Sequence, residues 1–448
     1  MPYNILDALR LKRQDRRREY REICRIVSKG DLLEFQEHHL KALLLHAYKN
    51  VPYYHRVFNE VELIQSGEVD LSKFDRVPVL TKDVLRRFSS ELISKDHNTR
   101  HWFYNTSGGS TGEPVRFIQD RELARRVGGT EYYYYKDVLG VAEPTAKKVL
   151  LWGSERDIFK NSIGIKAKIY NSMTHTVLLN SFRMEREDID RYIDKINSYK
   201  PDIVRGYAGS LFELCRHADD EKIKLHSPKI VVSAAETLHD EMRDIIESSF
   251  GSSVYNFYGS REASCMAAEC RNNSMHVFSF LHHLEVLNDE NQAVKNGEEG
   301  KIAVTSLHSY SMPFIRYEIG DTAIQGDGAC SCGSVLPTLA KVTGRIVDHF
   351  VKDNGTTVPA EFFIHLIGVV CHTGVIKKFQ VIQEDYRNIR ILVVLQNELP
   401  KSYREKVGGK IRKVMGDCDI VWDAVDDIPK NPSGKYTYTR SLVPKETN

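Results

Sequence analysis

The chain contains one glycine-rich segment whose composition suits phosphate binding. Its residues are Thr106, Ser107, Gly108, Gly109, Ser110, Thr111 and Gly112. Glycines let a ligand approach the backbone closely, and successive amide groups with hydroxyl side chains can surround a polyphosphate. Glu113, not lysine, follows Gly112, so the segment is not a Walker A loop. A plain surface turn is the competing interpretation, because such composition is common between elements.

Metal-binding residue types occur in two pairs that are far apart in the sequence. Cys270 and His276 lie six positions apart, and Cys330 and Cys332 flank a single serine. Thiolates and an imidazole at this spacing suit a tetrahedral structural zinc site. The alternative is that the cysteines only pack in the core. A catalytic cysteine is not expected, since no base is placed to activate one. Spare candidate ligands are Cys265, His282 and His283.

Four further polar motifs follow the glycine-rich segment. They are Tyr258-Gly259-Ser260-Arg261-Glu262, Arg316-Tyr317-Glu318-Ile319-Gly320-Asp321, Gly344-Arg345-Ile346-Val347-Asp348 and Asn431-Pro432-Ser433-Gly434-Lys435. Each motif alone could be purely structural: a turn, a salt-bridged strand, a linker or a surface loop. It would be an implausible coincidence if all four were purely structural and yet followed a phosphate-binding composition in this order.

In this colinear order, from about residue 35 to residue 440, the chain resembles the adenylate-forming, or acyl-activating, enzymes. Within that superfamily it looks like the branch of phenylacetate–coenzyme A ligases, with its CapK-like and coenzyme F390 synthetase-like members. Residues 47–54 and 78–82 are further local matches. The resemblance implies an α/β fold, with a large multi-sheet adenylation domain over residues 1–347 and a small mobile α+β lid over residues 348–448.

The resemblance also implies a reaction. A carboxylic acid, acyl or aryl, is joined to AMP with release of pyrophosphate, and the acyl group then passes to coenzyme A. ATP, Mg²⁺ and coenzyme A are therefore the implied cofactors. Segment 106–112 would hold the β- and γ-phosphates, and Glu262 would ligate Mg²⁺, which prefers carboxylate and phosphate oxygens. Asp321 would accept hydrogen bonds from the ribose, and Arg345 would lie near the ribose and phosphate.

Further contacts follow from the same resemblance. Tyr258 and Gly259 belong to the nucleotide site, and Ala235 with Glu236 stands where the family often has Gly-Glu against the adenine. The acyl pocket would include Tyr207, Ala234 and Phe257. Similar Cys and His clusters occur in relatives of this branch, which favours structural zinc at the two Cys and His pairs.

The resemblance makes Lys435, Glu262 and Arg261 the catalytic residues and Asp348 the hinge. Lys435 would be the adenylation lysine, whose ammonium bridges the carboxylate and the α-phosphate. Asp348 would be the hinge about which the lid rotates between the half-reactions. Many family members carry Ser or Thr before the motif glutamate, whereas Arg261 stands here. Arg261 either stabilises phosphate charge or pairs with Glu262 as a structural strut, and both alternatives stay open.

The elements that must position these residues follow from periodicity. A helix is expected through residues 40–48 and ends at Pro52, and another begins near Thr81. Strand-like runs at 148–152, 202–206 and 229–233, with a helix over 239–250, indicate parallel α/β structure. Near the C-terminus, 379–382, 389–395, 401–415 and 419–422 predict a β-β-α-β unit. Tyrosines 132–135 either line the acyl pocket or lie on a helix that buries one or two rings, and the helix is favoured.

Composition limits the remaining function classes. The 448 residues are 41% hydrophobic, and 63 basic against 61 acidic residues give a net charge of +2. This near balance argues against a nucleic-acid binder, and the absence of a long apolar run argues against stable membrane insertion. No signal-like segment begins the chain, and cysteines are few, so a cytoplasmic protein is expected.

The basic segment from Arg10 to Arg25 has two interpretations. It is either a surface for an anionic partner or membrane, or a solvated helix face on which Asp15, Glu19 and Glu22 pair with arginines three or four residues away. The solvated face is favoured.

Alternatives for the whole chain are an adenylating ligase that uses a carrier-protein thiol or an amine or hydroxyl acceptor, and a non-catalytic nucleotide-binding protein. The expected partners are a small carboxylic acid and a thiol acceptor, and a homodimer is one assembly considered.

Overall fold

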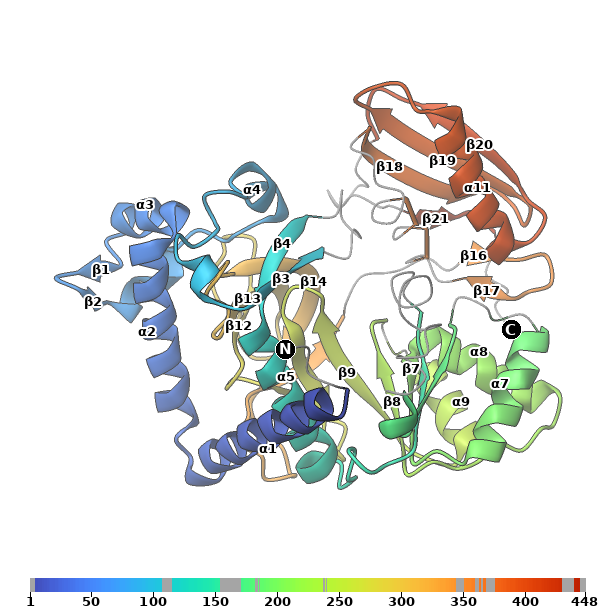
Figure 1. Ribbon diagram of the computed structural model, residues 1–448, viewed down its shortest axis with the longest axis horizontal. Helices are drawn as coiled ribbons and strands as arrows, with labels where there is room; N and C mark the ends of the chain where they lie inside the picture. Colours follow the sequence, from blue (N-terminus) through green and yellow to red (C-terminus); the bar gives the residue numbers. More distant parts are fainter. Residues whose placement is uncertain are drawn as a thin grey trace. The chain divides into compact units, whose positions relative to one another are not determined.

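The computed structural model describes residues 5–106, 115–153, 171–181, 184, 186–236, 238, 240–343, 350–358, 362–363, 366–367, 375–428 and 439–443. The chain divides into two compact units (Figure 1). Unit 1 comprises residues 1–107, 115–145 and 255–345, and unit 2 comprises residues 108–114, 146–254 and 346–448. Each unit is described by itself below.

Unit 1 begins with helices. They are α1 (Ile5–Lys29), α2 (Leu32–Asn50), α3 (Pro52–Glu60), α4 (Lys82–Arg87) and α5 (Arg121–Tyr133). The predicted helix before Pro52 is confirmed, since α2 ends at Asn50 and the proline, which suits a first helical position, starts α3. The predicted start near Thr81 is also confirmed, because its hydroxyl accepts a hydrogen bond from the Val84 amide at 3.3 Å as an N-cap.

The strands of unit 1 form an antiparallel sheet with the order β12-β13-β14-β15-β11-β10-β9. Their bounds are β9 (Val254–Ser260), β10 (Ser264–Glu269), β11 (Met275–Val277), β12 (His282–Leu287), β13 (Glu299–Ser306), β14 (Tyr317–Gln325) and β15 (Thr338–Val342). Short hairpins β1 (Ile64–Gln65) with β2 (Glu68–Val69), and β3 (Trp102–Thr106) with β4 (Arg116–Asp120), complete the strands of this unit. One hydrophobic cluster joins the sheet to α2, α3 and the β4 strand.

A fully buried arginine lies at the centre of this packing. Arg316 is 1% exposed and forms a two-pronged ion pair with Glu285, both N···O distances being 3.1 Å. The same guanidinium donates to the carbonyl oxygens of Asp75, Val77 and Asn291. A buried charge is tolerated only when it is paired and fully hydrogen-bonded, so Arg316 fixes β12, the start of β14 and the segment before α4 together.

The tyrosine run differs from the prediction. Three rings are buried, those of Tyr133, Tyr134 and Tyr135, where one or two were expected. After α5 the backbone continues as a π-helical turn over Tyr134–Val138, which departs from the 3.6-residue period that the prediction assumed. Tyr134 is anchored there by donating to the Glu269 carbonyl at 3.0 Å.

Unit 2 contains the predicted parallel sheet. Strands β6 (Thr176–Leu179), β5 (Lys148–Leu151), β7 (Ile203–Tyr207) and β8 (Ile230–Ala234) lie side by side in that order, all parallel. Helices α7 (Arg186–Tyr199), α8 (Ala208–Asp220) and α9 (Asp240–Phe250) pack against it through an apolar cluster. The predicted strands and the helix after β8 are confirmed, whereas β6, α7 and α8 had no sequence-based expectation.

The C-terminal β-β-α-β prediction is also confirmed. Strands β18 (Ile376–Gln383) and β19 (Asn388–Leu395) precede α11 (Lys401–Met415) and β20 (Asp419–Ala424), and β21 (Thr439–Ser441) adds an edge, giving the order β20-β19-β18-β21. A short hairpin of β16 (Phe350–Val351) and β17 (Thr357–Val358) comes before it. The expected α/β class is therefore confirmed. The predicted domain border between residues 347 and 348 lies outside the described residues and stays a proposal.

Among the described residues, none of the helices combines the length and the apolar content needed to cross a bilayer.

Three histidines of unit 1 are held in surroundings that disfavour their charged form. Burial, followed by the nearby Arg126 charge, lowers the pKa of His39 to about 4. Burial likewise lowers the pKa of His282 to about 4 and that of His308 well below its usual range. The rings of His39 and His308 lie 4.9 Å apart, so protonation of one would also oppose protonation of the other.

These histidines predict acid lability. Their folded pKa values lie below the unfolded value of about 6.5, so their contribution to stability is present above that pH and is lost as the pH falls toward about 4. His39→Gln should flatten the dependence of the urea unfolding midpoint on pH between about 7 and 4.5. The control is His38→Gln, which removes the exposed neighbouring ring 5.4 Å away and should keep the wild-type profile. Identical profiles for all three proteins would contradict the assignment.

Candidate functional site

Within unit 1, hydrogen bonds join the strand before the glycine-rich segment to the Tyr258–Glu262 motif. The Asn105 side-chain amide donates to the Arg261 carbonyl at 3.3 Å and to the Gln119 side chain at 3.2 Å. Gln119 in turn donates to the Glu262 carbonyl at 3.2 Å. Because Asn105 lies on β3 and Gln119 on β4, the hairpin that flanks segment 106–114 is tied directly to the motif between β9 and β10.

A second hydrogen bond joins the Tyr258 motif to the Asp321 motif. The Tyr258 hydroxyl donates to Asp321 Oδ2 at 2.9 Å. Asp321 lies in the middle of β14 and Tyr258 near the end of β9, strands that are not neighbours in the sheet. Residues 63 positions apart in the sequence are thus brought together, and the orientation of the Asp321 carboxylate is restricted.

Glu262 is held in a buried position beside the same residues. It is 5% exposed, and its Oε1 accepts a hydrogen bond from the fully buried Tyr317 hydroxyl at 3.3 Å. A carboxylate in such surroundings is oriented before any ligand arrives, which suits a ligand to a hard cation. Arg261, the residue before it, has a half-buried side chain.

The predicted adenine contacts lie in unit 2, after the end of β8. Ala235 has φ +68°, a left-handed conformation that costs strain for any residue but glycine. A glycine would adopt this conformation without strain. The next residue, Glu236, accepts a 2.7 Å hydrogen bond from the Gly209 amide in the first turn of α8, a favourable location for a carboxylate.

The predicted acyl-pocket residues are all buried. Tyr207 donates to the Gly153 carbonyl at 2.6 Å, and its ring lies 4.6 Å from that of Trp152. It packs in a cluster with apolar residues of the C-terminal region. Ala234 is 3% exposed at the end of β8, and Phe257, in unit 1, packs its ring 5.3 Å from that of Tyr134. Their role in substrate binding stays a prediction.

Several predicted site residues fall outside the described part of the chain. They are Ser107, Gly108, Gly109, Ser110, Thr111, Gly112, Arg345, Asp348 and Lys435. Thr106, at the end of β3, is the described member of the glycine-rich segment.

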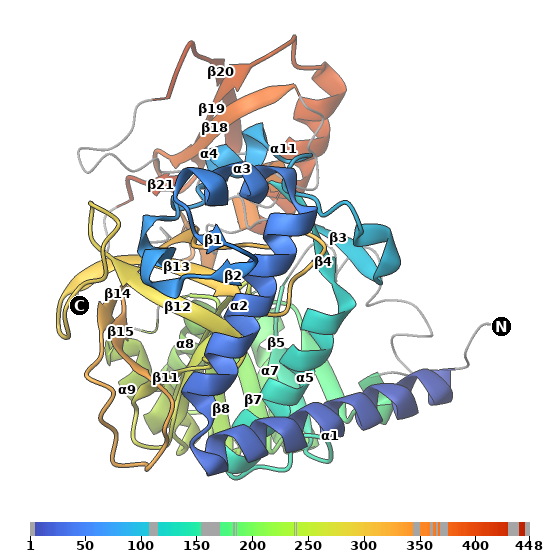
Figure 2. The ribbon, with the colours of Figure 1, turned by 90° about the vertical axis from the view of Figure 1, so that its left-hand side faces the viewer.

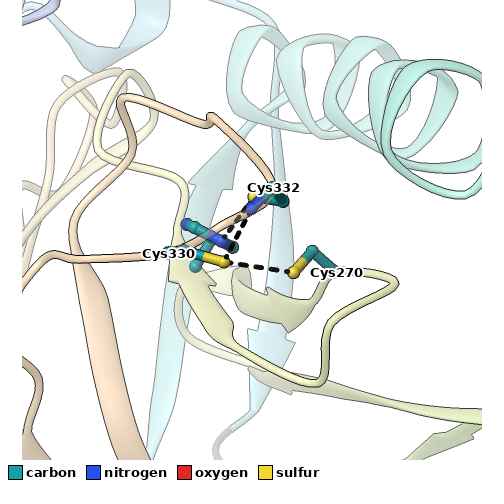
Figure 3. A group of neighbouring side chains, drawn as sticks. Cys270, Cys330 and Cys332 are labelled. Carbon is teal, nitrogen blue, oxygen red and sulfur yellow. Dashed lines mark hydrogen bonds between the residues drawn. The ribbon is translucent and has the colours of Figure 1, made fainter.

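The predicted metal ligands are brought together. The ligand atoms of Cys270, His276, Cys330 and Cys332 all lie within 4.8 Å of one another. Figure 3 shows the three sulfur atoms around a common centre. Cys270 and His276 are placed by the β10–β11 hairpin, and the other two precede β15, which pairs with β11. The spare candidates Cys265, His282 and His283 do not belong to this group.

Further hydrogen bonds orient the ligand atoms of this group. The His276 Nδ1 lies 3.1 Å from the Leu336 carbonyl, which favours a proton on Nδ1 and leaves Nε2 facing the Cys332 sulfur at 3.3 Å. Backbone amides donate to each sulfur at 3.4 Å: those of Asn272, Cys332 and Ser334. The sulfur atoms of Cys270 and Cys330 are 3.7 Å apart, too far for a disulfide bond.

The thiols differ in acidity. Burial raises the pKa of the Cys330 thiol, but hydrogen bonds from Ser274 and the Cys332 amide outweigh it and lower that pKa to about 6. Burial raises the pKa of Cys332 to about 11. One sulfur of the group is therefore a thiolate near neutral pH, which is the form that binds metal.

Sequence reasoning did not identify Asn105, Gln119 or Tyr317. Asn105 directly precedes the glycine-rich segment and Tyr317 lies inside a recognised motif, so a sequence motif pointed to the neighbourhood of both. No sequence motif pointed to Gln119, because a glutamine in a strand is ordinarily a surface residue. Only the fold shows that it is 5% exposed and bonded to the Glu262 backbone.

The chain is similar in sequence to known proteins. A family model described as the CapK C-terminal domain matches residues 350–441. Protein CapK of Staphylococcus aureus is 24% identical over 443 residues, covering 97% of this chain and 95% of CapK. Phenylacetate-coenzyme A ligase of Thermus thermophilus is 23% identical over 371 residues, covering 78% of each chain.

Solved structures share the fold. A 2-hydroxyisobutyryl-CoA ligase, bound to 2-HIB-AMP and CoA in the thioesterification state, superimposes with a TM-score of 0.57 at 18% identity, covering 93% of this chain and 89% of the ligase. Its open conformation gives a TM-score of 0.54 at 17% identity, covering 90% and 89%. Over most of its length the chain is therefore similar to protein CapK and to a phenylacetate-coenzyme A ligase. It shares the fold of the solved acyl-CoA ligases, in line with the family resemblance of its motifs.

Gly259 should tolerate no side chain. A Cβ at this position would lie 2.3 Å from the Ser264 carbonyl oxygen of the paired strand. Gly259→Ala should therefore lower the free energy of unfolding by about 2 kcal/mol or more, because β9 and β10 must separate. Gly409→Ala is the control, since a Cβ there meets open space on α11, and should raise stability by about 0.5–1 kcal/mol. Urea denaturation of both variants measures the contrast, and equal effects would contradict it.

Proposed function

We propose that the protein activates a carboxylic acid as an acyl-adenylate and passes the acyl group to the thiol of coenzyme A. The observation that carries the proposal is the linkage of three distant motifs within unit 1. Asn105 next to Thr106, the Tyr258–Glu262 segment and Asp321 are joined by the hydrogen bonds described above. The relatives named as coenzyme A ligases support the reaction class.

In the first half-reaction a carboxylate oxygen of the acid bonds to the α-phosphorus of ATP, and pyrophosphate leaves. Asp321, oriented by Tyr258, would accept hydrogen bonds from the ribose hydroxyls. Segment 106–112 would surround the β- and γ-phosphates with amides and hydroxyl groups. Lys435 would donate to the carboxylate and α-phosphate oxygens, where negative charge accumulates.

The divalent cation would be held by Glu262, whose carboxylate is buried and oriented by Tyr317. When bound, Mg²⁺ neutralises phosphate charge. In the second half-reaction the coenzyme A thiol loses its proton and attacks the acyl carbon, and AMP leaves. The family resemblance implies that the C-terminal lid rotates about Asp348 between the half-reactions. This rotation would move Lys435 away from the acyl-adenylate and bring the thiol channel to it.

A second class of acyl acceptor is an alternative to coenzyme A. The relative that covers nearly the whole chain is protein CapK, and the C-terminal match is to the CapK domain, not to a ligase domain. Transfer to a carrier-protein thiol, or to an amine or hydroxyl, is therefore the alternative. Mass analysis of the product with and without coenzyme A separates these acceptors.

Adenylation is tested by ATP–pyrophosphate exchange with a library of carboxylic acids. Tyr258→Phe should raise the KM for ATP about fivefold, because Asp321 loses one orienting hydrogen bond. Lys435→Ala should abolish exchange but largely spare thioester formation from a supplied adenylate. Tyr386→Phe, an exposed tyrosine, is the control and should behave as wild type.

Exchange with no acid, from folded protein that still binds ATP, would instead support the non-catalytic nucleotide-binding alternative. Equal loss of both half-reactions in Lys435→Ala would show that the role of the lysine is misassigned.

We further propose that the Cys270, His276, Cys330 and Cys332 group holds structural zinc. Three sulfurs and one imidazole nitrogen within 4.8 Å provide the donor number and type for a closed tetrahedral site. The four residues leave no protein ligand position open, so the ion would cross-link the β10–β11 hairpin to the segment before β15. Its contribution would be to stability and to the position of β10, which follows Glu262 directly.

Metal analysis of the purified protein should give about one equivalent of zinc. Cys332→Ser should lose the metal and lower the thermal midpoint by about 5 °C or more, because the cross-link is removed. Cys24→Ser, which changes a cysteine outside the group, should retain both. Less than about half an equivalent, with a midpoint unchanged by chelator, would contradict the site.

A further inference from the structure

The outward face of α1 carries only cationic and uncharged side chains over most of its width. Arg17, Arg18, Arg21, Arg25 and Lys29 are all exposed. In helical projection these five positions fall within an arc of about 120°, and no acidic residue between positions 14 and 29 shares it. From Arg17 to Lys29 this arginine face extends about 18 Å along the helix.

Two acidic residues of α1 face α5 instead. Glu19 is buried and lies 2.6 Å from Arg125 and 3.3 Å from Arg126, both on α5. Glu22 also faces Arg126, at 3.7 Å. The expectation that Glu19 and Glu22 pair with arginines of their own helix is therefore wrong, because their carboxylates pair with arginines of α5. Figures 1 and 2 show α1 lying beside α5.

The arginine face is consequently uncompensated. Within the described ranges, no carboxylate lies within ion-pair distance of Arg17, Arg18, Arg21, Arg25 or Lys29. The face is a local concentration of charge in a chain whose net charge is only +2. None of the five residues of this face is among those of the proposed nucleotide site.

An exposed apolar residue follows this face in the sequence, four positions after Lys29. Leu33, at the start of α2, is 76% exposed, the highest fraction among the large apolar residues described. Gly30, with φ +75°, makes the turn between the two helices. The neighbouring Asp31 and Glu34 are also exposed, so Leu33 could enter an interface only to a shallow depth. A basic helix face with an adjacent apolar side chain fits the polar–apolar boundary of an anionic membrane.

We propose that α1 docks the protein reversibly on anionic membrane surfaces, with the arginine face against lipid headgroups and Leu33 in the interfacial layer. Five cations on one straight helix face match a plane of negative charge. A single leucine adds too little apolar area for permanent anchoring, so the binding is peripheral and sensitive to salt. A nucleic acid fits less well, because it would gain nothing from Leu33.

The full chain is tested by co-sedimentation with vesicles that contain about 30% phosphatidylglycerol in phosphatidylcholine, and with phosphatidylcholine alone. Binding is expected only to the anionic vesicles, and about 0.5 M salt should remove it. The triple variant Arg17→Gln, Arg21→Gln, Arg25→Gln should weaken partitioning about a hundredfold. Leu33→Ser should weaken it about tenfold. All four side chains are exposed, and thermal unfolding of each variant verifies its fold.

The matched control removes the same charge elsewhere, with Lys195→Gln, Lys222→Gln, Lys224→Gln, three exposed lysines of unit 2. This control should bind anionic vesicles like the wild type. Equal weakening in both triple variants would overturn the proposal, because net charge alone would then explain the binding. Absence of vesicle binding would overturn it as well. Tighter binding to duplex DNA or RNA, unaffected by Leu33→Ser, would assign the face to nucleic acid instead.

Discussion

The buried ion pair between Arg316 and Glu285 is the interaction on which unit 1 most depends. Loss of one partner would leave a charge inside the core, which typically costs about 3–5 kcal/mol. The left-handed φ of +50° at Arg316 also sets the direction in which β14 begins. The next residue is Tyr317, which contacts Glu262, and Asp321 follows on the same strand and contacts Tyr258. One desolvated guanidinium thus positions both carboxylates of the proposed nucleotide site through a short, rigid stretch of chain.

The same sheet connects this site to the cysteine and histidine group. β10 begins just after Glu262 and ends just before Cys270, so a short strand separates the buried carboxylate from the first sulfur ligand. The group closes the far end of the β10–β11 hairpin, whereas Gln119 and Asn105 hold the near end. Hydrogen bonds restrain the strand at the near end, and the proposed zinc ion would add a cross-link at the far end. Bound there, the ion would act on the nucleotide site only indirectly, through the position of β10.

Much of the fold was predictable because its signals are local. Residue spacing alone placed the strands β5, β7, β8, β18 and β19, and the helices α9 and α11, within a few residues of their observed bounds, and it placed the end but not the start of α2. The metal-ligand set was also predictable, since cysteine and histidine at close spacing have few other common uses. Gln119 and the third buried tyrosine were not predictable. Their burial follows from contacts with segments more than a hundred residues away, namely Glu262 with Gln119 and Glu269 with Tyr134.

The sequence by itself determined the order of the nucleotide motifs, the kinds of chemistry that they permit and most of the local elements. These properties depend on residue type and short-range periodicity, which do not require a partner. Only the tertiary structure decided which side chains meet. It turned Glu19 and Glu22 of α1 toward α5 and left Arg17, Arg21 and Arg25 outward, although the sequence allows either pairing. The physical reason is that burial and ion pairing depend on residues that are distant in the sequence. They are decided when two amphipathic surfaces pack, because a buried charge without a partner costs the most free energy.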